Sequence, residues 1–76
     1  MSETADEPAL KLARMAGQIA TFFESYPEAE AVPAIADHIN QFWSRRMRED
    51  FASAFRPGDP ALHPLVSKAL PHIKAG

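Results

Sequence analysis

The chain has 76 residues, of which 46% are hydrophobic and 24% are charged, and its net charge is −2. A single domain of this size has a thin core, because it buries only about 60% of the surface that its unfolded chain exposes. The absence of cysteine excludes disulfide bonds, cysteine-ligated zinc or iron–sulfur clusters and a thiol nucleophile. The acidic balance disfavours binding to nucleic acid. We therefore expect one small globular domain, part of whose apolar surface needs a partner.

The N-terminal residues lack the features of an export signal. Residues 1–7 are acidic and contain neither a basic n-region nor an apolar h-region. We predict a disordered acidic tail over 1–7 and a single helical domain over 8–74. No apolar run approaches the roughly 20 residues that span a bilayer. The expectation is a cytoplasmic protein without a membrane contact.

The first predicted helix begins near Pro8 and ends at Tyr26-Pro27, because the residue before a proline is pushed out of the α region. Its apolar residues recur at the spacing of one helical face: Leu12, Met15, Ala16, Ile19, Phe22, Phe23 and Tyr26. Gly17 lies inside this helix, where glycine costs about 1 kcal/mol relative to alanine. A close helix crossing at Gly17 is one explanation.

The second predicted helix follows Pro27, and Pro33 leaves two alternatives for its start. Either a short turn spans 28–32, or the helix is kinked at Pro33, which lacks the N–H of a helical hydrogen bond. Apolar positions 35, 36, 39, 42, 43 and 47 then follow one helical face. Ser44 is a suitable cap for a third helix, and we favour a bend at Ser44 over one continuous helix.

The C-terminal part contains a loop and a last short helix. Residues 56–60, Arg-Pro-Gly-Asp-Pro, are dense in turn formers. Pro64 suits the first turn of a helix over 64–70, and Pro71 limits its length. The whole pattern predicts an all-α fold, a small bundle of three to four short helices with helix one antiparallel to helix two.

Few residues are candidates for chemistry. His38, His63 and His72 lack the spacing of a metal-ligand set on one helical face. The side chains of Asp37 and the adjacent His38 diverge on a helix, so they do not form a catalytic pair. No glycine-rich phosphate loop is present. We expect no catalytic residue, metal, cofactor or small-molecule substrate in this chain.

The aromatic residues and one arginine indicate a partner surface instead. Six large rings and Tyr26 exceed what one small helical core hides, so we expect Trp43 and either Phe23 or Phe51 to face a partner. Basic residues follow Trp43, and most such runs are solvated helix faces. Arg48 is the exception that we predict at the interface, since tryptophan and arginine are common interface hot spots.

Two motifs are more specific than this pattern. The first is Met15-Ala16-Gly17-Gln18-Ile19-Ala20 followed by Phe22-Phe23, and the second is Ile-Ala-x-His-Ile-x-x-Phe-Trp-x-x-x-Met-Arg over 35–48. Together with Pro64-Leu65-Val66 and Ala69-Leu70, they resemble the small delta subunit of soluble, NAD-dependent, molybdenum-containing formate dehydrogenase. The chain departs from the pattern of that family at Gly17, where asparagine is usual, and at Arg45, where proline is usual.

The resemblance implies a non-catalytic accessory subunit of a cytoplasmic formate dehydrogenase, which passes electrons from formate to NAD. The chain would dock on the molybdenum-bearing catalytic subunit and support complex assembly or cofactor loading. The molybdenum cofactor, iron–sulfur clusters and FMN would belong to the partner subunits. Two alternatives stay open: a transient chaperone for insertion of the molybdenum cofactor, and a helix-turn-helix nucleic-acid binder. The residues expected at the partner interface are Trp43, Met47, Arg48, Phe23, Gln18, His38 and Phe51.

Overall fold

The computed structural model describes the backbone of residues 2–74 and the side chains from residue 9 onward. Within that part of the chain all regular structure is helical, which confirms the predicted all-α fold. The elements, in order, are α1 (Ser2–Phe22), α2 (Glu28–Phe42), α3 (Arg45–Ala54), α4 (Pro64–Ala69) and the 3₁₀-helix η1 (Leu70–His72). None of these helices is both long and apolar enough to cross a membrane.

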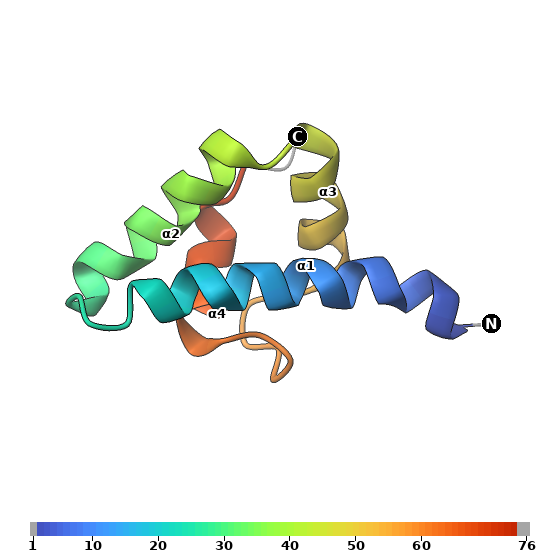
Figure 1. Cartoon of the computed structure of the whole chain (residues 1–76), viewed down its shortest axis with the longest axis horizontal. Helices are drawn as coiled ribbons and strands as arrows, with labels where there is room; N and C mark the ends of the chain where they lie inside the picture. Colours follow the sequence, from blue (N-terminus) through green and yellow to red (C-terminus); the bar gives the residue numbers. More distant parts are fainter. Residues whose placement is uncertain (1, 75–76) are drawn as a thin grey trace.

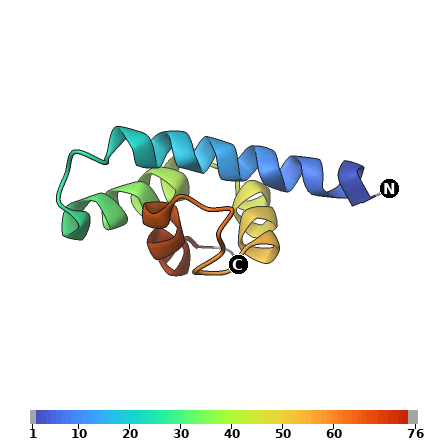
Figure 2. The same ribbon diagram turned by 90° about the horizontal axis from the view of Figure 1, so that it is seen from below.

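The long helix α1 runs the length of the molecule, and α2 returns in the opposite sense (Figure 1). The face of α1 that lies in the core is made mostly of small residues: Leu12, Ala13, Ala16 and Ala20. Small side chains let the other helices approach closely. Figure 2 shows these helices together on one side of α1. The tail predicted over 1–7 overlaps the first turns of α1, and its disorder stays a prediction.

Gly17 does not lie at a close helix crossing, so that explanation for it is wrong. A Cβ atom built on Gly17 would meet nothing within 4 Å. The adjacent Ala16 is fully buried and belongs to the core instead. Residues one position apart on a helix point about 100° away from each other, which puts Gly17 at the edge of the packed face.

The second helix keeps Pro33 inside it. Pro27 is the N-cap of α2, and the helix continues without interruption from Glu28 to Phe42. Of the two alternatives for Pro33, the structure therefore has the helix and not a separate turn over 28–32. Because proline has no N–H, the Ala29 carbonyl lacks the donor that a regular helix would supply.

The C-terminal segment closes the core. After a loop in which Gly58 takes a positive φ of 93°, α4 packs mainly against α2 and also contacts α1. The predicted helix over 64–70 is confirmed, with its last turn tightened into η1. The largest fully buried side chains are Phe51, Ile35, Ile39 and Val66. The core thus lies where α2, α3 and α4 meet on the small-residue face of α1.

Candidate functional site

A tight corner joins α2 to α3. Trp43 is the C-cap of α2 with extended backbone, and its N–H donates to the Ile39 carbonyl at 3.0 Å. Ser44 is the N-cap of α3, and its hydroxyl accepts from the Met47 N–H at 3.1 Å. This hydrogen bond satisfies one of the free donors of the first turn. The predicted bend at Ser44 is confirmed, and it forms with Arg45 as the next residue.

Arg48, on α3, forms a hydrogen bond back to α2 across this corner. Its Nη1 donates to the backbone carbonyl oxygen of Asn40 at 3.0 Å. That carbonyl belongs to the last turn of α2, where carbonyl groups have no partner within the helix and a cation is favourable. The Arg48 Nε is buried and has no hydrogen-bond partner within the described part of the chain. Arg48 therefore clamps the end of α2 to α3.

Three of the residues predicted at the interface lie in the core around this corner. Trp43 is only 7% exposed and packs edge-on against the fully buried Phe51, with ring centroids 5.5 Å apart. Met47 is partly buried against the same cluster. The structure thus brings Trp43, Met47, Arg48 and Phe51 together, as a joint between two helices of this chain. Their contact with a partner stays a prediction.

The other predicted residues are Gln18 on α1, Phe23 directly after α1, and His38 on α2. Phe23 and His38, with Ile19 and Phe22, line a hollow of about 260 Å³ between the two helices. The His38 ring stacks on Phe42, with centroids 4.7 Å apart. Gln18 is exposed, one turn before Phe22 on α1. The sequence prediction therefore combined residues from two places, the α2–α3 corner and the α1–α2 hollow.

Two exposed rings beside this hollow were missed by the sequence analysis as partner contacts. Phe22 is 70% exposed and Phe42 is 71% exposed. Around the axis of α1, Phe22 points about 120° away from the buried Ala16. The spacing of these two residues in the sequence therefore already indicated that Phe22 lies off the buried face. Phe42 is in phase with the buried face of α2. It stays uncovered because α2 diverges from α1 towards its C-terminal end, as Figure 1 shows.

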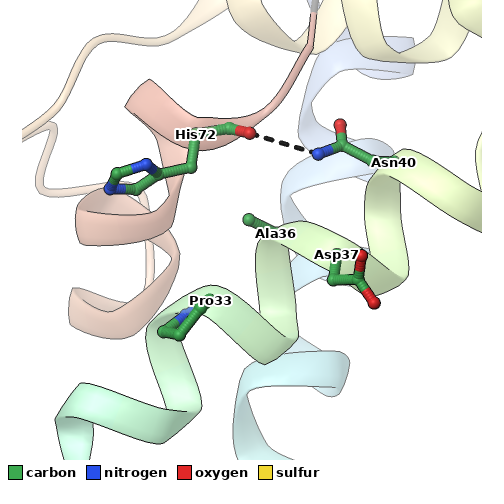
Figure 3. A pocket seen from close by; sticks show the side chains of 5 residues that line it. All are labelled: Pro33, Ala36, Asp37, Asn40 and His72. Carbon is green, nitrogen blue, oxygen red and sulfur yellow. Dashed lines mark hydrogen bonds between the residues drawn. The ribbon is translucent and has the colours of Figure 1, made fainter.

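Asn40 links α2 to the C-terminal segment. Its side-chain amide donates to the His72 carbonyl at 3.1 Å, and its side-chain oxygen accepts from the Lys74 N–H at 2.8 Å. Figure 3 shows the amide directed at this carbonyl, while the His72 ring turns away. These groups lie at a hollow of about 330 Å³ lined by Pro33, Ala36, Asp37, Asn40 and His72. Since the Asn40 side chain is used in internal hydrogen bonds, we assign it a structural role.

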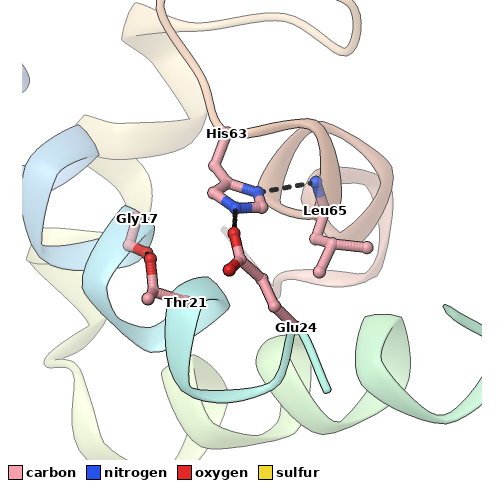
Figure 4. Close-up of polar contacts among 5 residues, drawn as sticks. All are labelled: Gly17, Thr21, Glu24, His63 and Leu65. Carbon is pink, nitrogen blue, oxygen red and sulfur yellow. Dashed lines mark hydrogen bonds and ion pairs between the residues drawn. The ribbon is translucent and has the colours of Figure 1, made fainter. Parts of the chain in front are cut away.

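His63 joins α4 to the end of α1, as Figure 4 shows. It is the N-cap of α4, and its Nδ1 accepts from the Leu65 N–H at 3.1 Å, while its Nε2 contacts the Glu24 carboxylate. An accepting Nδ1 carries no hydrogen, so the hydrogen of the neutral ring lies on Nε2 and is donated to Glu24. The side chain of Lys68 makes a second link, to Glu28 at 2.7 Å. These contacts hold α4 against the α1–α2 turn.

The histidines lie on separate elements. Among the described side chains, those of residues 9–74, no three histidine, aspartate or glutamate residues form a group that could hold a metal ion. The expectations that this chain carries no metal or cofactor and performs no catalysis stay predictions. The candidate functional feature is therefore the α1–α2 hollow with its exposed rings.

Comparison with known families identifies a match over most of the chain. The family model described as the NADH-dependent formate dehydrogenase delta subunit, FdsD, matches residues 11–70. The match spans α2, α3, α4 and most of α1, so it includes both the corner and the hollow. Searches of curated proteins and of solved structures find no significant match.

Proposed function

The chain belongs to the family of NADH-dependent formate dehydrogenase delta subunits, and on this premise we propose that it is a non-catalytic accessory subunit of a cytoplasmic enzyme. It docks on the molybdenum-bearing subunit and supports assembly of the complex or loading of the cofactor. Formate and NAD are then handled by the other subunits, and this chain takes no small-molecule substrate.

The observation that supports docking is the exposure of Phe22 and Phe42. Both rings are more than two-thirds exposed. Aromatic side chains contribute strongly to stability and to binding when they are buried, so these two rings have apolar area that a partner can cover. The two rings belong to neighbouring helices and lie next to the same hollow. A protein subunit that covers them would remove this apolar surface from water.

The absence of cysteine in this chain supports the placement of the iron–sulfur clusters in other subunits. Protein iron–sulfur clusters are held mainly by cysteine thiolates, and this chain has no cysteine. We therefore propose that the molybdenum cofactor, the iron–sulfur clusters and FMN are all bound by partner subunits.

The alternative function within the same complex is a transient chaperone that leaves after the molybdenum cofactor has been inserted. The two functions differ in whether the chain stays in the active enzyme. A helix-turn-helix nucleic-acid binder is disfavoured by the net charge of −2.

The test is co-expression of the affinity-tagged chain with the other subunits of its formate dehydrogenase. We expect the molybdenum-bearing subunit to co-purify at a one-to-one ratio with full activity. Omission of the chain should lower the molybdenum content or the yield of assembled enzyme. Absence of the chain from active enzyme, with binding only to the cofactor-free subunit, would instead identify the chaperone. Absence of binding to every subunit would overturn the proposal.

A further inference from the structure

The most exposed apolar surface is the aromatic face. We define it as Ile19 and Phe22 of α1, Phe23 directly after α1, and His38 and Phe42 of α2. Four of these side chains line the hollow of about 260 Å³, and Phe42 extends it by stacking on His38. The face is therefore continuous from α1 to α2.

The exposed rings of the aromatic face are held in place by rings behind them. Phe22 lies edge-on against Phe23, with centroids 5.0 Å apart and planes at 90°. Phe23 is itself packed against the core. Phe42 contacts the partly buried His38 with a tilted geometry, at a centroid distance of 4.7 Å and an angle of 39° between the planes. The contact with a second ring restricts the conformations of each exposed ring, which lowers the conformational entropy that these side chains lose when a partner binds.

The chemistry of the aromatic face is apolar. His38 is the only titratable residue among its five members. Two carboxylates are adjacent in sequence to members of the face, and both have partners within the chain. Asp37 accepts a hydrogen bond from Gln41 at 2.7 Å, and Glu24 contacts His63. A partner therefore needs apolar side chains at this place rather than a charged group.

The size of the face decides between occupants. Its hollow, about 260 Å³, is smaller than the roughly 300–1,000 Å³ of small-molecule sites and suits single side chains. The exposed parts of Phe22 and Phe42 amount to on the order of 300 Å². Two copies placed face to face would thus bury much less than the roughly 1,200 Å² of a stable interface. The rest of the area must come from a larger partner whose surface continues past the face.

We infer that the aromatic face receives an amphipathic helix of the molybdenum-bearing subunit, with one large apolar side chain of that helix in the hollow between Ile19, Phe22, Phe23 and His38. The hollow is lined by three apolar side chains and His38, and an apolar hollow of this kind is what receives a large side chain in the helix-in-groove mode of recognition. This inference rests on the proposed function and adds the surface and the class of partner segment.

The test compares two variants in the assembled complex. Phe22→Ser with Phe42→Ser removes both exposed rings, and Leu10→Ser is the matched control. Leu10 is 49% exposed on the same helix but lies beside Ala54 and Phe55, about 18 Å from Phe22 along α1. We expect the double variant to bind the molybdenum-bearing subunit at least about tenfold more weakly, and the control to bind like the unmodified chain.

Circular dichroism of the isolated variants separates loss of binding from loss of fold. If the unmodified chain and the double variant bind equally, the aromatic face is not the docking surface, although the proposed function stands. If the unmodified chain binds no subunit, the proposed function itself fails.

A photoreactive benzoylphenylalanine at position 22 identifies the occupant directly. In the assembled enzyme we expect a crosslink to a helical peptide of the molybdenum-bearing subunit. A crosslink to a second copy of this chain, or none in a complex that assembles normally, would overturn the inference.

Discussion

Arg48 and Asn40 lie on either side of the bend at Ser44 and are joined across it, because the Arg48 guanidinium donates to the Asn40 carbonyl at 3.0 Å. The same Asn40 holds the C-terminal segment through its side chain. One residue thus connects α2, α3 and the end of the chain. The Met-Arg pair of the second motif therefore has a structural role within the chain, whether or not it also contacts a partner.

Replacement of Arg48 should destabilise the isolated chain. Arg48→Ala removes a charge-assisted hydrogen bond and leaves the Asn40 carbonyl without that partner. Hydrogen bonds to charged groups contribute about 1.5–3 kcal/mol, and partial exposure of Arg48 favours the lower end. Urea unfolding measures the loss. Arg46→Ala is the control, because Arg46 is exposed and such changes usually stay within about 0.5 kcal/mol. Equal stability of the two variants would contradict the clamp.

Truncation to alanine should destabilise the chain strongly at Phe51 and very little at Phe22. Phe51 is fully buried, whereas Phe22 is 70% exposed. Phe51→Ala should lower the free energy of unfolding by about 3–5 kcal/mol, most of the stability expected for so small a domain. Phe22→Ala should change it by no more than about 0.5 kcal/mol. Thermal unfolding of both variants checks this, and a large loss for Phe22→Ala would show that its ring belongs to the core.

Gly17→Ala should stabilise the isolated chain. The added methyl group meets nothing within 4 Å, and alanine is favoured over glycine inside a helix by about 1 kcal/mol. In a domain of this size, that gain raises Tm by about 4–8 °C. Ala16→Gly, one residue earlier on the buried face, is the reverse change and should lower Tm. A lower Tm for Gly17→Ala would contradict the open surroundings of this residue.

The N-cap of α4 should tolerate another capping residue at position 63. His63→Ala removes the Nδ1 acceptor from the Leu65 N–H and the contact with Glu24, and loss of a cap costs about 0.5–2 kcal/mol. His63→Asn restores an acceptor for the cap but not the contact with Glu24. We therefore expect its unfolding free energy to lie between those of His63→Ala and the unmodified chain. If both variants lost the same unfolding free energy, the stabilisation by His63 would come from its contact with Glu24 and not from the cap.

The starts of α2, α3 and α4 could be predicted from local signals, whereas α1 begins at Ser2 rather than near Pro8 and ends at Phe22 rather than at Tyr26. Proline at 27 and 64 and serine at 44 each mark a helix start, because their chemistry acts on the backbone next to them. The corner at Ser44 forms without a proline at position 45, since the serine hydroxyl supplies the cap. Pro33 was ambiguous, because the missing hydrogen bond is a cost that packing of the remaining helix can outweigh.

The exposure of individual rings could not be predicted in the same way. A helical stripe shows which residues share a face, but the course of the neighbouring helix decides which of them are covered. Trp43 stands at the end of its stripe, and the bend then brings Phe51 over it. Phe42, one residue earlier, is left in solvent because α1 and α2 diverge.

The position of Trp43 also gives the protein an optical reporter. It is the only tryptophan in the chain, and its indole lies almost completely out of solvent against Phe51 at the α2–α3 corner. Its emission should therefore be blue-shifted in the folded chain and shift to longer wavelength when the corner opens. Added iodide quenches the emission of an accessible indole. Because the aromatic face does not include the corner, a partner that covers only this face should leave the quenching of Trp43 by iodide unchanged. Intrinsic fluorescence can thus follow the integrity of the joint in the isolated chain without any label.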